Sequence, residues 1–549
     1  MALTEKFFDS AAAGGGNGSL ASPYNTLASL TALTGIKARL KRGSVFNEPW
    51  SVTGNGFEIV DYGDALARPM LTGAVAVNSG WIADSTSGVW YHPTAGLHFI
   101  YFDAALATVA PDSVIGRTAG RFATVASLAL CRATVYTAFW DTGTSRLYGN
   151  FGTTTAPTGI TMTSASFDTG IRGDACYNFE LSEVDVRFFE NFSFNFAAGS
   201  GDGIYIHDVS AWYTSGRPAT GGGQGSLGFA LQVAGLNAGA RKTNVAVDRA
   251  DLQFSYSDSL LFNDIDGLSA HNNFIAYANN VIECHQQCLN ARFTVNRAHT
   301  IGYGGSGGRN TFLALVGDNG QHTNVLLEGN IGYFLRAHGA NIMSSDGFKA
   351  RGNVFYKYGH SNLSSSGVLL QNQLGGTNVN PTVKNNILVS EFSPSTNNNG
   401  ALEMYNPGAV DAFGTGGIDN NLYWTIGLAG DGAPYSTTTL RLLTYRATNY
   451  FAVDKTTFNN NTHAYKIAAA LDGAEQNSKN FDPLFVDPDN GDFRLQGGSP
   501  ALSMGANYWA GAAEGRPSCL HSAAAGMYTA GAAPDTAIAA GAVQAKLIA

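Results

Sequence analysis

The sequence predicts an all-β solenoid, a fold in which short strands stack coil upon coil. Two observations predict it. From about residue 174 to residue 424, short apolar stretches alternate with Asn, Gly and Asp, and no segment has a sustained helical period. Segments of one pattern begin at residues 243, 266, 323 and 346, so two of the three intervals equal 23 residues. A short fixed period indicates stacked units that bury their apolar faces against their neighbours.

Composition and charge exclude several classes. With 44% hydrophobic and only 13% charged residues, the chain carries too much apolar surface for an intrinsically disordered protein. The formal net charge of -9 provides no basic field, so we expect no nucleic-acid partner. No run of about 18 apolar residues occurs, so we expect no membrane insertion. The start also lacks the basic and apolar regions of a signal peptide.

Four consecutive parts are expected along the chain. Residues 1–74 form an N-terminal cap and the first coils. Residues 75–165 fit coils poorly, and aromatic stretches such as Val89–Tyr91 and His98–Phe102 predict a small antiparallel β insertion. Residues 166–430 form the central coils. Residues 431–549 form the last coils and a C-terminal cap, because an open solenoid end would expose unpaired strand edges.

Each central coil is expected to contain a tight turn built on asparagine. Asparagine tolerates left-handed backbone dihedrals, and its amide can bond to the asparagine of the next coil. The predicted ladder consists of Asn273, Asn330, Asn353 and Asn386. Strands at 203–207, 259–263, 281–285, 341–345, 368–371 and 401–405 also superpose. Alternate residues of these strands are apolar and should face inward, which leaves the intervening residues as an outward grid.

These repeats resemble the right-handed parallel β-helix proteins of the polysaccharide lyase, pectinase and phage tailspike kind. Phe8–Leu27 with Leu40–Phe46 is similar to the N-terminal segment of such lyases, and Asp482–Leu495 with Gly498–Ala501 is similar to their closing coil. The resemblance implies a right-handed parallel β-helix that acts on a polysaccharide. It also implies a homotrimer located outside the cell or on a phage particle, and the absent signal peptide favours the particle. The Lys/Arg catalytic motif of the lyases has no match in this chain.

The strongest candidates for chemistry are Glu283 and His285, which lie two residues apart on one predicted strand. Both should project from one face about 7 Å apart and could act as an acid/base pair. In a lyase, such a base removes the proton α to a uronate carboxylate, while Arg309 or a metal stabilises the resulting charge. Tyr303 or His285 would then protonate the leaving oxygen.

The lyase-like terminal motifs favour the lyase as the leading hypothesis, and a hydrolase is the runner-up, because the spacing of these residues is compatible with both reactions. Hydrolysis requires two carboxylates roughly 5 to 9 Å apart, and Glu283 with Asp258 or Asp264 on the adjacent coil would meet that requirement. A solvated surface role for Glu283 and His285 remains the alternative, because outward strand positions are polar by default. A noncatalytic glycan-binding adhesin is the hypothesis from another class of protein.

The resemblance places the substrate cleft along the sheet that carries the outward grid, next to the long insertions 211–228 and 302–310. Rigid scaffolds commonly carry functional residues on such loops. The candidates for substrate binding are His207, Asn263, Trp212, Tyr213, Arg217 and Gln371. Asp487–Asp492 imitates a calcium loop but lacks the later glutamate, so a turn is favoured over a site. No cofactor is required by the sequence, and Ca²⁺ is the one ion to consider.

Overall fold

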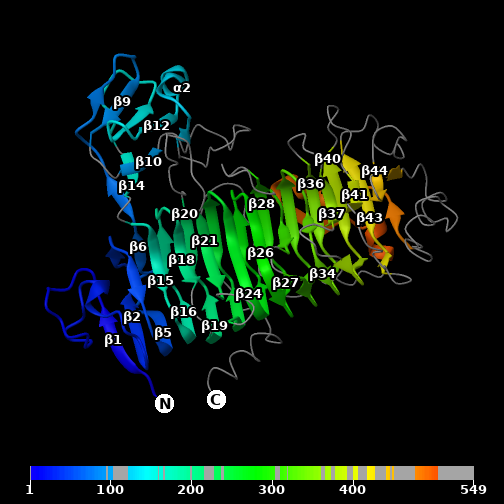
Figure 1. Ribbon diagram of the computed structural model, residues 1–549, viewed down its shortest axis with the longest axis horizontal. Helices are drawn as coiled ribbons and strands as arrows, with labels where there is room; N and C mark the ends of the chain where they lie inside the picture. The colour runs from blue at the N-terminus through cyan, green and yellow to red at the C-terminus, as the bar shows by residue number, and fades with distance from the viewer. Residues whose placement is uncertain are drawn as a thin grey trace. The chain divides into compact units, whose positions relative to one another are not determined.

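The computed structural model describes a nearly all-β protein with long runs of parallel strands (Figure 1). It divides into two compact units. The first unit comprises Met1–Asp266, Asn273–Glu283 and Thr300–Asn310, and the second comprises Gly267–Asn272, Cys284–His299 and Thr311–Ala549. The described residues are 2–93, 97–102, 122–158, 160–164, 167–197, 201–214, 228–235, 240–302, 310–317, 320–359, 365–371, 378–391, 400–405, 417–426, 441–445, 448–450 and 477–504.

Strands of the first unit stack in three parallel columns, one strand per coil in each column. The first column contains β15 (Thr169–Gly173), β18 (Phe192–Ala197), β21 (Phe229–Ala234) and the start of β24 (Asp258–His271). The second contains β16 (Tyr177–Ser182), β19 (Gly201–His207) and β22 (Lys242–Asp248). The third contains β17 (Asp185–Arg187), β20 (Ser210–Thr214), β23 (Asp251–Ser255) and β25 (Phe274–Ala276). The predicted all-β parallel β-helix is confirmed.

The core of the first unit lies inside these columns. Phe194 and Phe196 on β18 are fully buried, as are Leu260 and Phe262 on β24. These residues alternate with outward ones because side chains of a strand point to opposite faces in turn. The alternation that the sequence predicted for 259–263 is therefore confirmed, and it places Asn263 on the outer face.

In the second unit, the buried asparagine ladder runs through five coils. The backbone and side-chain nitrogens of Asn330 both donate to Oδ1 of Asn353, at 3.0 and 2.9 Å, and Asn353 bonds to Asn386 in the same way. Asn296 precedes this series and Asn421 follows it, so the structure extends the predicted ladder at both ends. Asn273 lies in the first unit, where its Oδ1 accepts from the Ala250 backbone. The predicted ladder is confirmed for Asn330, Asn353 and Asn386.

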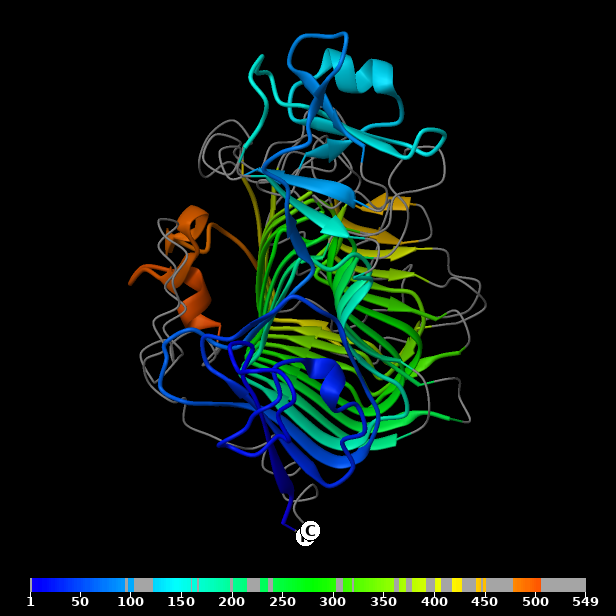
Figure 2. The ribbon, with the colours of Figure 1, turned by 90° about the vertical axis from the view of Figure 1, so that its left-hand side faces the viewer.

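Between the first coils, the chain forms the antiparallel insertion that the sequence predicted. One small sheet contains β10 (Leu97–Phe102), β14 (Ile160–Ser164) and β7 (Ala74–Ala76), all antiparallel. In another, β12 (Thr137–Asp141), β13 (Arg146–Asn150) and β9 (Val89–His92) pair antiparallel. Cys131 on α2 (Leu128–Ala133), drawn in cyan in Figure 2, packs with Val89 and Tyr148.

Near the end of the described chain, β47 (Phe485–Asp487) and β48 (Asp492–Leu495) form a hairpin of the second unit. Phe485 and Phe493 of this hairpin pack against Tyr333 and Tyr356. None of the helices in the described segments has the length and apolarity needed to cross a membrane.

Candidate active site

Two buried carboxylates of the first unit share one amide group. Nδ2 of Asn280, at the start of β26 (Asn280–Leu289), donates to Oδ1 of Asp258 at 2.7 Å and to Oε2 of Glu283 at 2.5 Å. An asparagine amide has two N–H groups, so each carboxylate receives one. Because both oxygens contact the same nitrogen, they lie at most about 5 Å apart. The structure thus brings together two residues that the sequence predicted for hydrolysis.

The stacking of the coil corners places these residues next to one another. The backbone N–H of Ser257 donates to the Gly228 carbonyl, and the N–H of Asn279 donates to the Ser257 carbonyl. Asp258 and Asn280 each directly follow this stacked corner, so their side chains meet across two successive coils. Asn280 is not among the residues that the sequence predicted for the site. Its sequence position could have indicated it, because Asn280 lies one coil after Asp258 and, like Asp258, stands at the start of a buried strand.

Glu283 is an outward residue of β26 that is nevertheless almost inaccessible. It lies between Ile282 and Cys284, which are fully buried and face inward, yet Glu283 is itself only 7% exposed. His285 lies two residues further along the same strand and is half-buried. Glu283 belongs to the first unit and His285 to the second, so the predicted acid/base pair stays a prediction.

Asp264 and Asn263 lie side by side on β24 but differ in conformation. Asp264 is buried and has a φ of 49°, in the left-handed region that Asp tolerates in turns. Asn263 pairs in register with Ala234 of the preceding coil. Its Oδ1 is buried and has no hydrogen-bond partner among the described residues. The predicted binding role of Asn263 remains a prediction.

His207 lies in a different column from Asn263, so the predicted superposition of 203–207 on 259–263 is wrong. It is the last residue of β19, which pairs with β16 and β22, whereas β24 pairs with β21. Its Nδ1 lies 2.7 Å from Asp208 and its Nε2 lies 3.0 Å from Glu180. Burial lowers the pKa of His207, but the hydrogen bonds to Asp208 and Glu180 outweigh burial and raise the pKa to about 9. His207 is therefore held as a cation among carboxylates.

Trp212 and Tyr213 are residues of β20 in the third column, and not of a loop beside the first column as predicted. The Tyr213 ring stacks between Phe188 and Phe254, with centroid distances of 4.8 and 4.7 Å. Both of its faces are covered, so it cannot stack on a sugar ring. Trp212 donates from Nε1 to Asp251 at 3.2 Å, and the Arg187 guanidinium lies 4.5 Å from its ring centre.

Gln371, the last residue of β37 (Ser366–Gln371), is a buried residue of the second unit. Its Nε2 donates to Oδ1 of Asn341 at 2.6 Å. The remaining predicted site residues, Arg217, Tyr303 and Arg309, lie outside the described residues.

The segment Asp487–Asp492 is a turn whose carboxylates are already engaged. Gly491 adopts a φ of 81°, which the turn requires. Asp489 forms an ion pair with Lys357 at 2.8 Å and accepts from the Tyr356 hydroxyl at 3.1 Å. Asp492 accepts from Arg494 at 2.8 Å. Within the described part of the chain, no cluster of three or more His, Cys, Asp or Glu residues could hold a metal ion.

Comparisons with known proteins give matches among solved structures only. No family model and no curated protein matches the sequence. The chain is similar to a structure described as a glycoside hydrolase, with a TM-score of 0.47, 11% identity, and coverage of 81% of this chain and 95% of that chain. It is also similar to a lacto-N-biosidase from Eubacterium ramulus, with a TM-score of 0.43, 11% identity, and coverage of 81% and 68%. A tailspike protein from Pseudomonas phage LKA1 matches with a TM-score of 0.26, 9% identity, and coverage of 75% and 74%.

Proposed function

We propose that this protein cleaves glycosidic bonds of an extended bacterial surface or extracellular polysaccharide, with Asp258 and Glu283 as the reacting carboxylates. The observation that supports the proposal is the Asn280 amide, which holds the two carboxylate oxygens at most about 5 Å apart. A stack of parallel strands also offers a long rigid face, which suits a polymer better than a small metabolite.

Hydrolysis of a glycosidic bond requires one carboxylic acid and one carboxylate. The acid protonates the leaving oxygen, and the carboxylate either attacks the anomeric carbon or activates a water. The short separation supports direct attack, because a water-mediated reaction needs roughly 6.5 to 9.5 Å between the groups. We therefore propose a hydrolase that retains the anomeric configuration.

A lyase that performs β-elimination on a uronate is the second candidate. The placement of Glu283 and His285 two residues apart on β26 favours it. In that reaction, one of them removes the proton α to the uronate carboxylate. The predicted cation, Arg309, would stabilise the charge that develops there.

The two reactions and a noncatalytic adhesin are separated by one assay. The protein is incubated with a panel of bacterial polysaccharides while reducing ends and the absorbance of unsaturated uronates are followed. We expect new reducing ends without an absorbance gain. An absorbance gain would indicate the lyase, and binding without either signal would indicate the adhesin.

Substitution of the carboxylate pair tests the assignment of the site. We expect Glu283→Gln and Asp258→Asn each to lower kcat by about 10²- to 10⁴-fold, because acid/base groups contribute that much. The control is Glu328→Gln, which removes a surface ion pair with Arg351 and should leave kcat unchanged. NMR of the first product should show a retained anomeric configuration. Inversion, or full activity of both variants, would contradict the assignment.

A further inference from the structure

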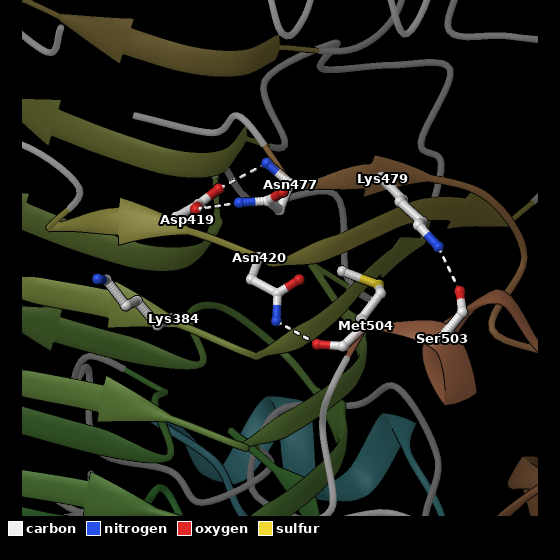
Figure 3. A pocket seen from close by; sticks show the side chains of 7 residues that line it. All are labelled: Lys384, Asp419, Asn420, Asn477, Lys479, Ser503 and Met504. Atoms are coloured by element: carbon white, nitrogen blue, oxygen red, sulfur yellow. Dashed lines mark hydrogen bonds between the residues drawn. The ribbon is translucent and has the colours of Figure 1, made fainter. Parts of the chain in front are cut away.

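An open groove of about 550 Å³ lies on the second unit, apart from the residues assigned above (Figure 3). Its walls come from β39 (Thr382–Lys384), β42 (Ile418–Asp419), β46 (Lys479–Asn480) and the 3₁₀ helix η3 (Pro500–Ser503), together with the residues that flank them. The lining residues are Lys384, Asp419, Asn420, Asn477, Lys479, Ser503 and Met504.

One cation of the groove forms no ion pair with any residue that the structure describes. Lys384 pairs in register with Arg351 on one side and Asp419 on the other. Arg351 is neutralised by Glu328 at 2.7 Å, and both oxygens of Asp419 accept from Asn477 at 2.8 Å. The half-buried Lys384 ammonium forms no ion pair or hydrogen bond with any described residue. A partly desolvated charge without a partner is unfavourable, so the groove presents an unsatisfied positive charge.

One further polar group of the groove retains bonding capacity. Nζ of Lys479 is engaged, since it donates to Ser503 Oγ at 2.5 Å and to the Pro500 carbonyl at 3.3 Å. Nδ2 of Asn420 is occupied by Asn385 Oδ1 and by the Met504 carbonyl. Its Oδ1 points away from these bonds and can accept from a hydroxyl (Figure 3).

We propose that this groove binds a sugar residue that bears a carboxylate. The carboxylate pairs with Lys384, a sugar hydroxyl donates to Oδ1 of Asn420, and the Met504 side chain supplies apolar contact. A bare inorganic anion fits less well, because it would leave Asn420 Oδ1 without a donor. The groove shares no residue with the carboxylate pair, so this binding does not depend on the proposed reaction.

The test uses the full chain with Asp258→Asn, so that turnover does not disturb binding. The probes are trigalacturonic acid and its methyl ester, which has the same shape without the charge. Isothermal titration should give at least tenfold tighter binding of the acid than of the ester. In Lys384→Gln that difference should vanish, whereas the control Lys349→Gln, an exposed lysine of β35 (Lys349–Arg351) outside the groove, should keep it.

Three outcomes would overturn the proposal. Equal affinity for acid and ester would show that the groove does not recognise the charge. Unchanged preference in Lys384→Gln would place the recognition elsewhere. Displacement of trigalacturonate by an equimolar amount of inorganic sulfate would show a general anion site, which contradicts the saccharide part of the proposal.

Discussion

Burial and the neighbouring carboxylates act in opposite directions on the pKa of His207. Its side chain is 15% exposed and lies between two carboxylates, one of which, Asp208, also binds Arg249 at 2.6 Å. Burial and the pairing with His207 and Arg249 act in opposite directions on the pKa of Asp208, and the pairing prevails and lowers it. The cluster therefore stays ionised near neutral pH.

The raised pKa of His207 predicts a loss of stability in alkali. The pKa of His207 rises from 6.5 to about 9 on folding, so protonated His207 stabilises the folded protein. This contribution to the free energy of unfolding is fully present below pH 6.5 and is lost as the pH rises through 9. It amounts to roughly 1 to 3 kcal/mol. We expect the difference in thermal midpoint between the natural protein and His207→Gln to be large at pH 6 and to vanish at pH 10. Asn324→Gly, which changes an exposed side chain that does not titrate, is the control and should show a constant difference.

At the scale of single residues, the sequence predicted the site in part. Asp258 and Glu283 were accessible to prediction because the hydrolase reaction requires a second carboxylate one coil away from the first. Asn280 could not be predicted in this way. Its role depends on the direction of its side chain at a coil corner, where the amide reaches both carboxylates, and the sequence does not show that direction. Tyr213 was misplaced for a related reason. Its ring is covered by neighbours from other coils, which local sequence does not reveal.

Among the structural elements, the asparagine ladder is the one whose disruption should be most destabilising. Asn353 is fully buried, accepts two bonds from Asn330, and donates to Asn386 and to the Leu327 carbonyl. Asn353→Ala would leave several buried polar groups without hydrogen-bond partners. Each such group lowers the free energy of unfolding by about 1 to 3 kcal/mol. We expect a decrease of roughly 2 to 5 kcal/mol in the free energy of unfolding.

Chemical denaturation of the variant and of a matched control measures this decrease. The control is Asn324→Gly, since Asn324 is exposed and has a φ of 54°, a conformation that glycine adopts without strain. It should unfold close to the natural protein. Similar midpoints for Asn353→Ala and Asn324→Gly would show that the ladder does not contribute as proposed.

The strand columns explain why the sequence-based alignment of His207 failed. Strands β18, β21, β24 and β26 begin at residues 192, 229, 258 and 280, so the coils differ in length. A search of the sequence for one fixed repeat length therefore aligns strands that have a similar alternation of apolar and polar residues, even when these strands lie in different columns. The segment 203–207 has the same apolar alternation as 259–263, and only the hydrogen-bonded register separates them.

For the whole molecule, composition and period were sufficient to predict the fold class. Few charges and many Gly and Asn residues suit stacked strands joined by tight turns, and the parallel columns confirm that inference. The division of the chain at residues 74, 165 and 430 stays a prediction. The limits of the insertion are hard to predict because its antiparallel strands alternate in the same way as those of the coils.

The homotrimer implied by the tailspike resemblance also remains a prediction at this scale. The chain has a mass of 57.6 kDa, and sedimentation equilibrium should give three times that mass. Because mass action governs assembly, the measurement should extend over a range of protein concentrations. A mass equal to one chain at all concentrations would contradict the trimer.

The buried ladder has a direction, which bears on how such a protein can lengthen. Each asparagine from Asn296 to Asn386 donates to the next one along the chain, and at Asn421 the backbone N–H donates instead to the Ser478 hydroxyl, which ends the series. A duplicated coil that brings its own asparagine would accept from the coil before it and donate to the coil after it. Growth by duplication is thus open at every internal step of the ladder, whereas insertion of a coil without asparagine would orphan the amides on both sides.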